Sequence, residues 1–185
     1  MQYDPVLYTG RPADRRSDRE ERCYELLDRL GVAYVRVDHE HADTIADCEQ
    51  VESLLGAKIC KNLFLTNRQQ TDFYLLLMPG EKPFKTKLLS KQIGSARLSF
   101  AGEADMERLL GLSPGSVSVL GLMHDREKTV QLLIDRDVLA EEAFGCHPCR
   151  NTSSLRFSTK DLLQTVLPAL GHEPRLVDLP WVIGE

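Results

Sequence analysis

At 185 residues, the chain is long enough for one buried core and short for two, because domains usually contain about 100 to 200 residues. Hydrophobic residues make up 42% and charged residues 28%, a balance that argues against a disordered or fibrous chain. The net charge of −5 argues against a general nucleic-acid binder, because neutralised phosphates supply most of the non-specific affinity of such proteins.

The first helix is predicted over residues 17–30, where Ser17 can cap it, acidic residues occupy the first turn and Gly31 ends it. The β-rich run 32–37 predicts a strand directly after this helix. A second helix is predicted over residues 45–55, ending at Gly56.

Two apolar runs, 62–66 and 73–78, predict a hairpin of buried strands, although periodicity alone leaves buried helices open. The remaining predicted elements are short helices over 85–92 and 103–110, strands over 117–123 and 129–134, and a last helix over 160–170.

Helices and strands are interspersed throughout the chain, without an internal repeat. This order predicts a single-domain α/β or α+β fold with a mixed sheet flanked by helices. The proline and charge at the two ends predict loosely held arms over 1–16 and 171–185, around a domain of residues 17–170.

The environment is expected to be cytoplasmic and reducing. No apolar run approaches the roughly 18 residues that span a bilayer, and the first residues lack a basic segment followed by an apolar one. The five cysteines have no regular spacing, so a secreted disulfide framework is a poor fit.

Positive charge gathers in one segment of this acidic chain. Residues 53–97 contain eight basic and two acidic residues, a balance of +6 that leaves −11 for the remainder. Such a segment can hold a polyanion locally while the rest of the molecule repels it, although a solvated helix face gives the same pattern.

Two parts of the sequence are candidate functional sites, although neither matches a recognised catalytic motif. Lys61 directly precedes an apolar strand, where it is either a reactive cation or an exposed solubilising residue. The stretch from Gly115 to Gly121 has small residues whose backbone amides could approach an anion or oxyanion, or it is a plain turn after Pro114.

The run Cys146-His147-Pro148-Cys149 has the spacing of a redox dithiol or of half a zinc site. Its late position, with proline inside it, argues against a thioredoxin-type motif, and no second cluster completes four metal ligands. Serine-triad, zinc-protease and phosphate-loop motifs are absent from the sequence.

Three motifs occur in a matching order and spacing: Lys61-Asn62-Leu63-Phe64-Leu65, Gly115-Ser116-Val117 leading to Gly121-Leu122, and His147-Pro148 followed by Asn151-Thr152. Together they resemble the YbaK family of aminoacyl-tRNA editing domains over roughly residues 20–170, in particular its freestanding prolyl-tRNA editing branch. The resemblance implies a mixed sheet flanked by helices.

The resemblance also implies a site. Lys61 corresponds to the main functional side chain, and the family's Gly-x-x-x-Pro loop falls on Gly115 to Val119, with Val119 in place of the proline. In this interpretation Cys146 and Cys149 are incidental neighbours of the site. The predicted substrate contacts are Gly115, Ser116, Val117, Val119, Gly121, His147 and Asn151.

The implied function is hydrolysis of the ester in mischarged tRNA, alanine on proline tRNA above all, without a cofactor or metal. The partner is the acceptor end of the tRNA, while association with an aminoacyl-tRNA synthetase and the oligomeric state stay open. The predicted tRNA contacts are Lys58, Lys82, Lys85 and Lys87. The alternatives are a non-catalytic tRNA-binding or regulatory module of the same fold and a thiol or metal protein built on Cys146 and Cys149.

Overall fold

The computed structural model describes residues 2–42 and 44–184. Its helices are α1 (Asp18–Arg29), α2 (Ile45–Leu55), α3 (Thr86–Ile93), α4 (Glu103–Leu110), the 3-10 helix η1 (Val119–His124), α5 (Arg136–Ala140), α6 (Thr159–Asp161), the π-helix η2 (Leu162–Val166) and α7 (Leu167–Leu170). Its strands are β1 (Tyr8–Thr9), β2 (Val35–Asp38), β3 (Cys60–Asn67), β4 (Phe73–Pro79), β5 (Leu98–Phe100), β6 (Val130–Asp135), β7 (Ala143–Cys146), β8 (Ser153–Ser158) and β9 (Arg175–Val177).

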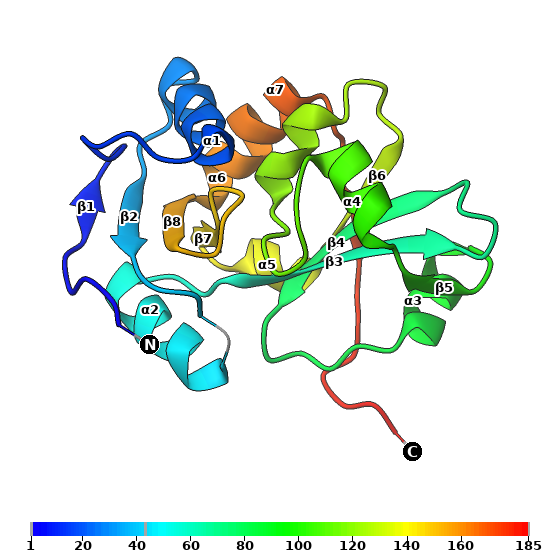
Figure 1. Ribbon diagram of the computed structural model, residues 1–185. Coiled ribbons are helices and arrows are strands. Elements are labelled where there is room, and N and C mark those ends of the chain that lie inside the picture. The colour runs from blue at the N-terminus through cyan, green and yellow to red at the C-terminus, as the bar shows by residue number, and fades with distance from the viewer. Residues whose placement is uncertain (1, 43, 185) are drawn as a thin grey trace.

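The strands form two sheets that lie side by side (Figure 1). The first sheet has the order β1-β2-β8-β7 and is antiparallel, whereas the second has the order β5-β3-β4-β6-β9 and is mixed. In the second sheet β3 is antiparallel to β4 and β5, while β6 is parallel to β4 and β9. A parallel bridge between Ile59 and Gly145 links the two sheets.

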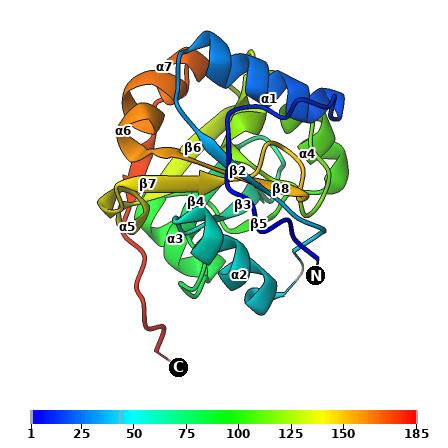
Figure 2. The ribbon, with the colours of Figure 1, turned by 90° about the vertical axis from the view of Figure 1, so that its left-hand side faces the viewer.

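Helices cover both sides of the sheets. In Figure 1, α1, α4, α6 and α7 lie above the sheets and α2 and α3 lie below; Figure 2 shows α1 and α2 on opposite sides of the first sheet. The largest core lies under the upper helices, and smaller cores lie between the sheets and α2 or α3. The predicted mixed fold flanked by helices is therefore confirmed.

Several predicted elements are confirmed almost to the residue, because local signals define them. The helices predicted over 45–55 and 103–110 have these bounds, and each ends at a glycine, Gly56 or Gly111, in the left-handed conformation. The Thr44 side chain accepts a hydrogen bond from the Asp47 amide at the start of α2. The predicted hairpin is the antiparallel pair of β3 and β4.

The strand predicted over 117–123 is wrong, because this region forms the 3-10 helix η1. The Ser118 side chain accepts a hydrogen bond from the Leu120 amide and starts the helix. Gly121 then packs so closely on Leu112 that an added Cβ would lie 2.6 Å from the Leu112 Cδ1 atom. Capping and tertiary packing thus override the strand preference of the valines.

The last predicted helix is interrupted by a π-helical segment between α6 and α7. Pro168 has no amide hydrogen, which explains a break in the regular pattern there. The two predicted arms each contribute a strand, since β1 pairs with β2 and β9 pairs with β6. In the described part of the chain, the helices are all too short or too polar to cross a membrane.

Candidate functional site

Lys61 lies near the start of β3, on the face of this strand that it shares with Leu63. Its Nζ donates a hydrogen bond to the backbone carbonyl oxygen of Lys82 at 2.8 Å. Partial burial lowers the pKa of the Lys61 ammonium below its usual value. Lys61 lines a groove together with Leu63, Phe84, Lys85, Thr86, Lys87 and Phe100.

The bridge between the sheets brings the segments of Lys61 and His147 together. Ile59 pairs in parallel with Gly145, and Lys61 and His147 follow these residues by two positions each. Parallel neighbours lie about 4.8 Å apart, so the two segments are close to each other at this bridge. Gly145 permits this approach, because a Cβ there would lie 2.5 Å from the carbonyl oxygen of Lys58.

His147 is partly exposed, and its Nδ1 lies 2.9 Å from the backbone carbonyl oxygen of Ser153. Burial lowers the pKa of His147 to about 4, so the ring is neutral at pH 7. Because a carbonyl oxygen only accepts, Nδ1 carries the proton and the lone pair of Nε2 can accept a hydrogen bond. The ring of His39 lies 6.2 Å from that of His147, centroid to centroid.

The loop from Gly115 to Gly121 is tied to the same segment. The Ser118 hydroxyl donates a hydrogen bond to the backbone carbonyl oxygen of His147 at 2.6 Å. The amides of Ser116 and Gly121, however, donate to nearby backbone carbonyl oxygens. Neither amide is therefore free to hold an oxyanion in this conformation, contrary to what the glycine pattern suggested.

Within this loop, the predicted substrate contacts differ in exposure. Val119 is fully buried in the upper core, where Val117 also packs, and Gly121 is buried against Leu112. Gly115 is exposed, has a φ of +82° and has no atom within 4 Å of an added Cβ. A substrate can therefore reach the beginning of the loop at Gly115. Val119 and Gly121 are buried and contribute to the packing that supports the loop.

Two asparagines carry buried side-chain oxygens that lack a hydrogen-bond partner within the described ranges, the Oδ1 atoms of Asn62 and Asn151. The Nδ2 of Asn62 donates to the carbonyl oxygen of Cys60, and the Nδ2 of Asn151 donates to that of Ala42. Buried oxygens are rarely unpaired, so both are candidate acceptors for a ligand. The sequence had no signal for Asn62, because only its burial marks the oxygen as unusual.

The four lysines predicted to contact tRNA have different environments. Lys85 and Lys87 are exposed and line the groove of Lys61. Lys58 is exposed but forms ion pairs with Glu52 and Glu81 at 3.3 and 3.2 Å.

Lys82 was expected on the tRNA-binding face, and this expectation is wrong because the side chain is fully buried. Its Nζ donates to both carboxylate oxygens of Asp135 at 3.0 Å and to Asp137 at 2.8 Å. Burial opposes the charge, but the hydrogen bonds with the two carboxylates raise the pKa of Lys82 on balance. A charge count along the sequence cannot separate such an internal ion pair from a surface cation.

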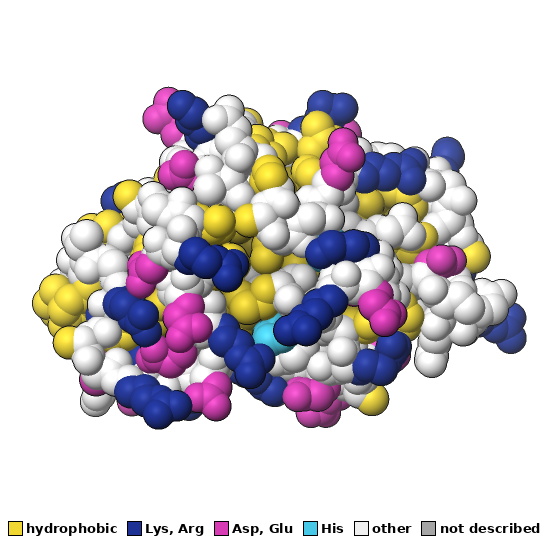
Figure 3. Space-filling view, turned by 90° about the horizontal axis from the view of Figure 1, so that it is seen from above, with side chains coloured by type: hydrophobic (Ala, Val, Ile, Leu, Met, Phe, Trp, Pro, Cys, Tyr) yellow, Lys and Arg dark blue, Asp and Glu magenta, His cyan; other side chains and the backbone are white. Residues whose placement is uncertain are grey.

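Positive charge also gathers on a face outside the basic segment. Seen from above, Lys and Arg side chains flank a histidine, and Asp and Glu side chains lie among them (Figure 3). Burial, followed by the charges of Arg22, Arg19 and Arg126, lowers the pKa of His124. These arginines come from α1 and from the turn before β6, so their proximity could not be seen in the sequence.

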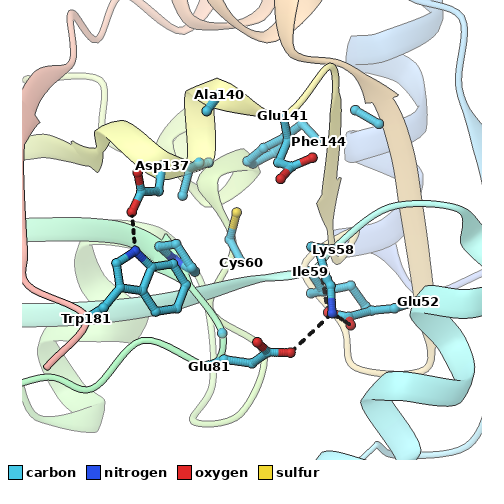
Figure 4. Close-up of a pocket in the computed structure, with 14 residues that line it drawn as sticks. Glu52, Lys58, Ile59, Cys60, Glu81, Asp137, Ala140, Glu141, Phe144 and Trp181 are labelled. Atoms are coloured by element: carbon cyan, nitrogen blue, oxygen red, sulfur yellow. Dashed lines mark hydrogen bonds and ion pairs between the residues drawn. The ribbon is translucent and has the colours of Figure 1, made fainter.

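A partly open cavity of about 410 Å³ lies beside the start of β3 (Figure 4). Cys60, Phe144 and Trp181 contribute to its walls. Its charged lining consists of Glu52, Lys58, Glu81, Asp137 and Glu141. An excess of carboxylates repels the phosphates of RNA, so this cavity is a poor place for the end of a tRNA.

The Cys146 and Cys149 side chains are buried, and Cys149 lies beside Cys23 with a distance of 3.4 Å between the Sγ atoms. Across residues 2–42 and 44–184, no group of three or more His, Cys, Asp or Glu side chains is placed to hold a metal ion.

Comparison of the sequence with models of known protein families identifies the family of this chain. The model of the aminoacyl-tRNA editing domain matches residues 39–165, which span the three motifs. The chain belongs to the aminoacyl-tRNA editing domain family. The expectation of an editing enzyme for aminoacyl-tRNA is thereby confirmed at the level of the family.

Among similar proteins, the prolyl-tRNA editing protein ProX of Acetoanaerobium sticklandii is 28% identical and covers 88% of this chain and 98% of its own. Prolyl-tRNA synthetase associated domain-containing protein 1 of Mus musculus is 30% identical and covers 83% of this chain and 94% of its own. The crystal structure of a proposed trans-editing enzyme for prolyl tRNA synthetase has a TM-score of 0.65 at 19% identity, covers 89% of this chain and 98% of its own, and shares the fold.

Proposed function

We propose that this editing domain hydrolyses the ester bond of alanine wrongly attached to proline tRNA. The family establishes the class of substrate, and the names of the relatives from Acetoanaerobium and mouse point to proline tRNA. The observation that carries the site is the parallel bridge of Ile59 with Gly145, which brings the segments of Lys61 and His147 together.

The reaction suits these side chains. An aminoacyl ester is already activated, so its hydrolysis needs a positioned water and stabilisation of the carbonyl oxygen, with no covalent intermediate. Water attacks the carbonyl carbon, the carbon–oxygen bond to the ribose breaks, and the ribose oxygen takes up a proton. Lys61 supplies positive charge to the carbonyl oxygen or the neighbouring phosphate.

The neutral ring of His147 contributes an acceptor. Its Nε2 can accept a hydrogen bond from the attacking water or the substrate amine, because Nδ1 faces the Ser153 carbonyl oxygen. The orphan oxygen of Asn151, four residues further along the chain, can accept from the same amine. These contacts hold the ester in place, which fits a site that excludes the larger correct amino acid by its shape.

The tRNA would approach over the groove of Lys61. Lys85 and Lys87 line this groove and are exposed, so they can pair with phosphates of the acceptor end. This arrangement lets an acidic protein bind RNA at one place. A cytoplasmic location and association with a synthetase stay predictions.

The test is the release of amino acid from proline tRNA charged separately with alanine, cysteine and proline. We expect rapid loss of alanine alone, and a decrease in kcat/KM of about a hundredfold or more in Lys61→Ala, as for removal of an oxyanion donor. Lys160→Ala, which removes an exposed lysine from α6, is the matched control.

A fully active Lys61→Ala protein would overturn the assignment of the site. Loss of cysteine in place of alanine would correct the substrate. Binding of the tRNA without release of any of the three amino acids would favour the non-catalytic module.

A further inference from the structure

Lys82 connects a buried ionic cluster to the candidate site through its own backbone. The side-chain ammonium is enclosed by Asp135 and Asp137, and its carbonyl oxygen accepts the hydrogen bond from Lys61 at 2.8 Å. The same residue is therefore anchored at one end and touches the predicted functional lysine at the other.

The cluster is rigid because several chain segments converge on it. Besides Lys82, Asp135 accepts hydrogen bonds from the amides of Asp137 and Leu179. Trp181 donates from Nε1 to Asp137 at 2.7 Å, and its ring lies over the Lys82 ammonium, 5.1 Å from the centroid. The loop after β4, the end of β6 and the C-terminal segment are thus joined.

The buried ion pair is a strong restraint on the backbone of residue 82. Neither Lys82 nor Asp135 has any exposed side-chain surface, so separation of the pair would leave an uncompensated charge inside the protein. A carbonyl oxygen attached to such an anchor has little freedom to move. Lys61, by contrast, has a long, flexible side chain that a groove alone does not orient.

We propose that Lys82, held by Asp135 and Asp137 and covered by Trp181, is a positioning residue for Lys61. This inference rests on the proposed function, in which Lys61 acts on the ester. In this proposal the C-terminal segment covers the cluster through Trp181, whereas its composition predicts a loosely held arm.

The decisive variant is Lys82→Met combined with Asp135→Asn, which removes both fully buried charges together, while the partly exposed Asp137 keeps its hydrogen bond from Trp181. Two properties are measured in the full-length protein: kcat and KM for release of alanine, and the pH dependence of acylation of Lys61 by an amine-reactive reagent, read by peptide mass spectrometry. The second measurement needs no tRNA.

We expect kcat to fall about tenfold to a hundredfold, as for a displaced functional group, with KM changed less than about twofold. The acylation profile of Lys61 should move to lower pH, because the ammonium loses the carbonyl oxygen that stabilises its charged form. Trp181→Phe, which keeps a ring over Lys82 but loses the Nε1 donor, should move both properties in the same direction by a smaller amount.

The matched control is a second buried pair at the other end of β6, where His172 Nε2 lies 2.9 Å from Asp125. Asp125→Asn with His172→Gln removes a pair of similar burial, so it should lower the melting temperature without altering kcat or the acylation profile. This control separates general destabilisation from an effect on Lys61.

The proposal is overturned if either measurement stays at its wild-type value in the folded double variant. If that variant does not fold, Trp181→Phe decides, and two unchanged measurements overturn the proposal. A wild-type protein without deacylase activity would contradict the proposed function alone, since the acylation profile still tests whether Lys82 holds Lys61.

Discussion

Two neighbouring residues at the start of β3, Cys60 and Lys61, face opposite sides of the strand, and the two sides differ in chemistry. Lys61 faces an open groove with the exposed Lys85 and Lys87. Cys60 packs against the upper core, which also contains Cys146. The side of Lys61 is thus open and carries further lysines, whereas the side of Cys60 packs on a core that contains a second thiol.

Burial makes the thiol side inert. It raises the pKa of Cys60 to about 12 and raises the pKa values of Cys23 and Cys146 as well. Thiols with raised pKa values stay protonated at pH 7 and are poor nucleophiles. The comparison shows that the CxxC spacing alone does not define a reactive site, because the surroundings of the sulfur decide its ionisation.

The largest expected effect is on the free energy of unfolding, which should depend on pH through protonation of His147. Its pKa of about 4 in the folded protein lies below the usual 6.5, so the folded state binds fewer protons than the unfolded state between these values. The full contribution to stability is present above pH 6.5 and is lost as the pH falls toward 4. This dependence amounts to at most about 3 kcal/mol.

Urea unfolding of the wild type and of His147→Gln at pH 7, 6, 5 and 4 measures this contribution. The variant should lose less stability on acidification, since Gln does not titrate. His39, whose pKa is also lowered by burial, contributes with the same sign in both proteins. Parallel stability curves for the two proteins would show that His147 is not held neutral by the fold.

The next effect concerns the groove. Lys85→Gln with Lys87→Gln should raise KM for the tRNA about tenfold and leave kcat unchanged, because the two lysines bind phosphates away from the ester. The slope of log affinity against log salt should decrease by about 0.7 for each lost contact with single-stranded RNA. Lys160→Gln is the control for loss of a surface lysine.

An unchanged KM would place the tRNA elsewhere. Arg19, Arg22 and Arg126, whose charges act on His124, are then the next residues to replace.

The smallest expected effect is on the thiol side. Cys149→Ser should change the rate of deacylation by less than about twofold, because a buried thiol that contacts Cys23 cannot reach the ester. The rate is measured with the same charged tRNA, before and after treatment with a thiol-blocking reagent. A tenfold lower rate of deacylation in Cys149→Ser would instead support a functional role for the thiols.

The sequence was sufficient for most elements of the fold, because their signals act over a few residues. Thr44 and Gly56 delimit α2, and Gly111 ends α4, through contacts within a turn of helix. The three motifs were likewise sufficient for the family. The strand predicted over 117–123 is wrong, because its valines favour a strand locally whereas packing on Leu112 decides the outcome.

What the sequence determined by itself was the class of protein, the local elements and Lys61 as the residue to examine. Only the tertiary structure decided that the segments of Lys61 and His147 meet at a bridge between two sheets, and that Lys82 is buried against Asp135. The physical reason is distance along the chain: these partners are 53 or more residues apart, so their contacts depend on strand pairing and desolvation, which no local pattern encodes.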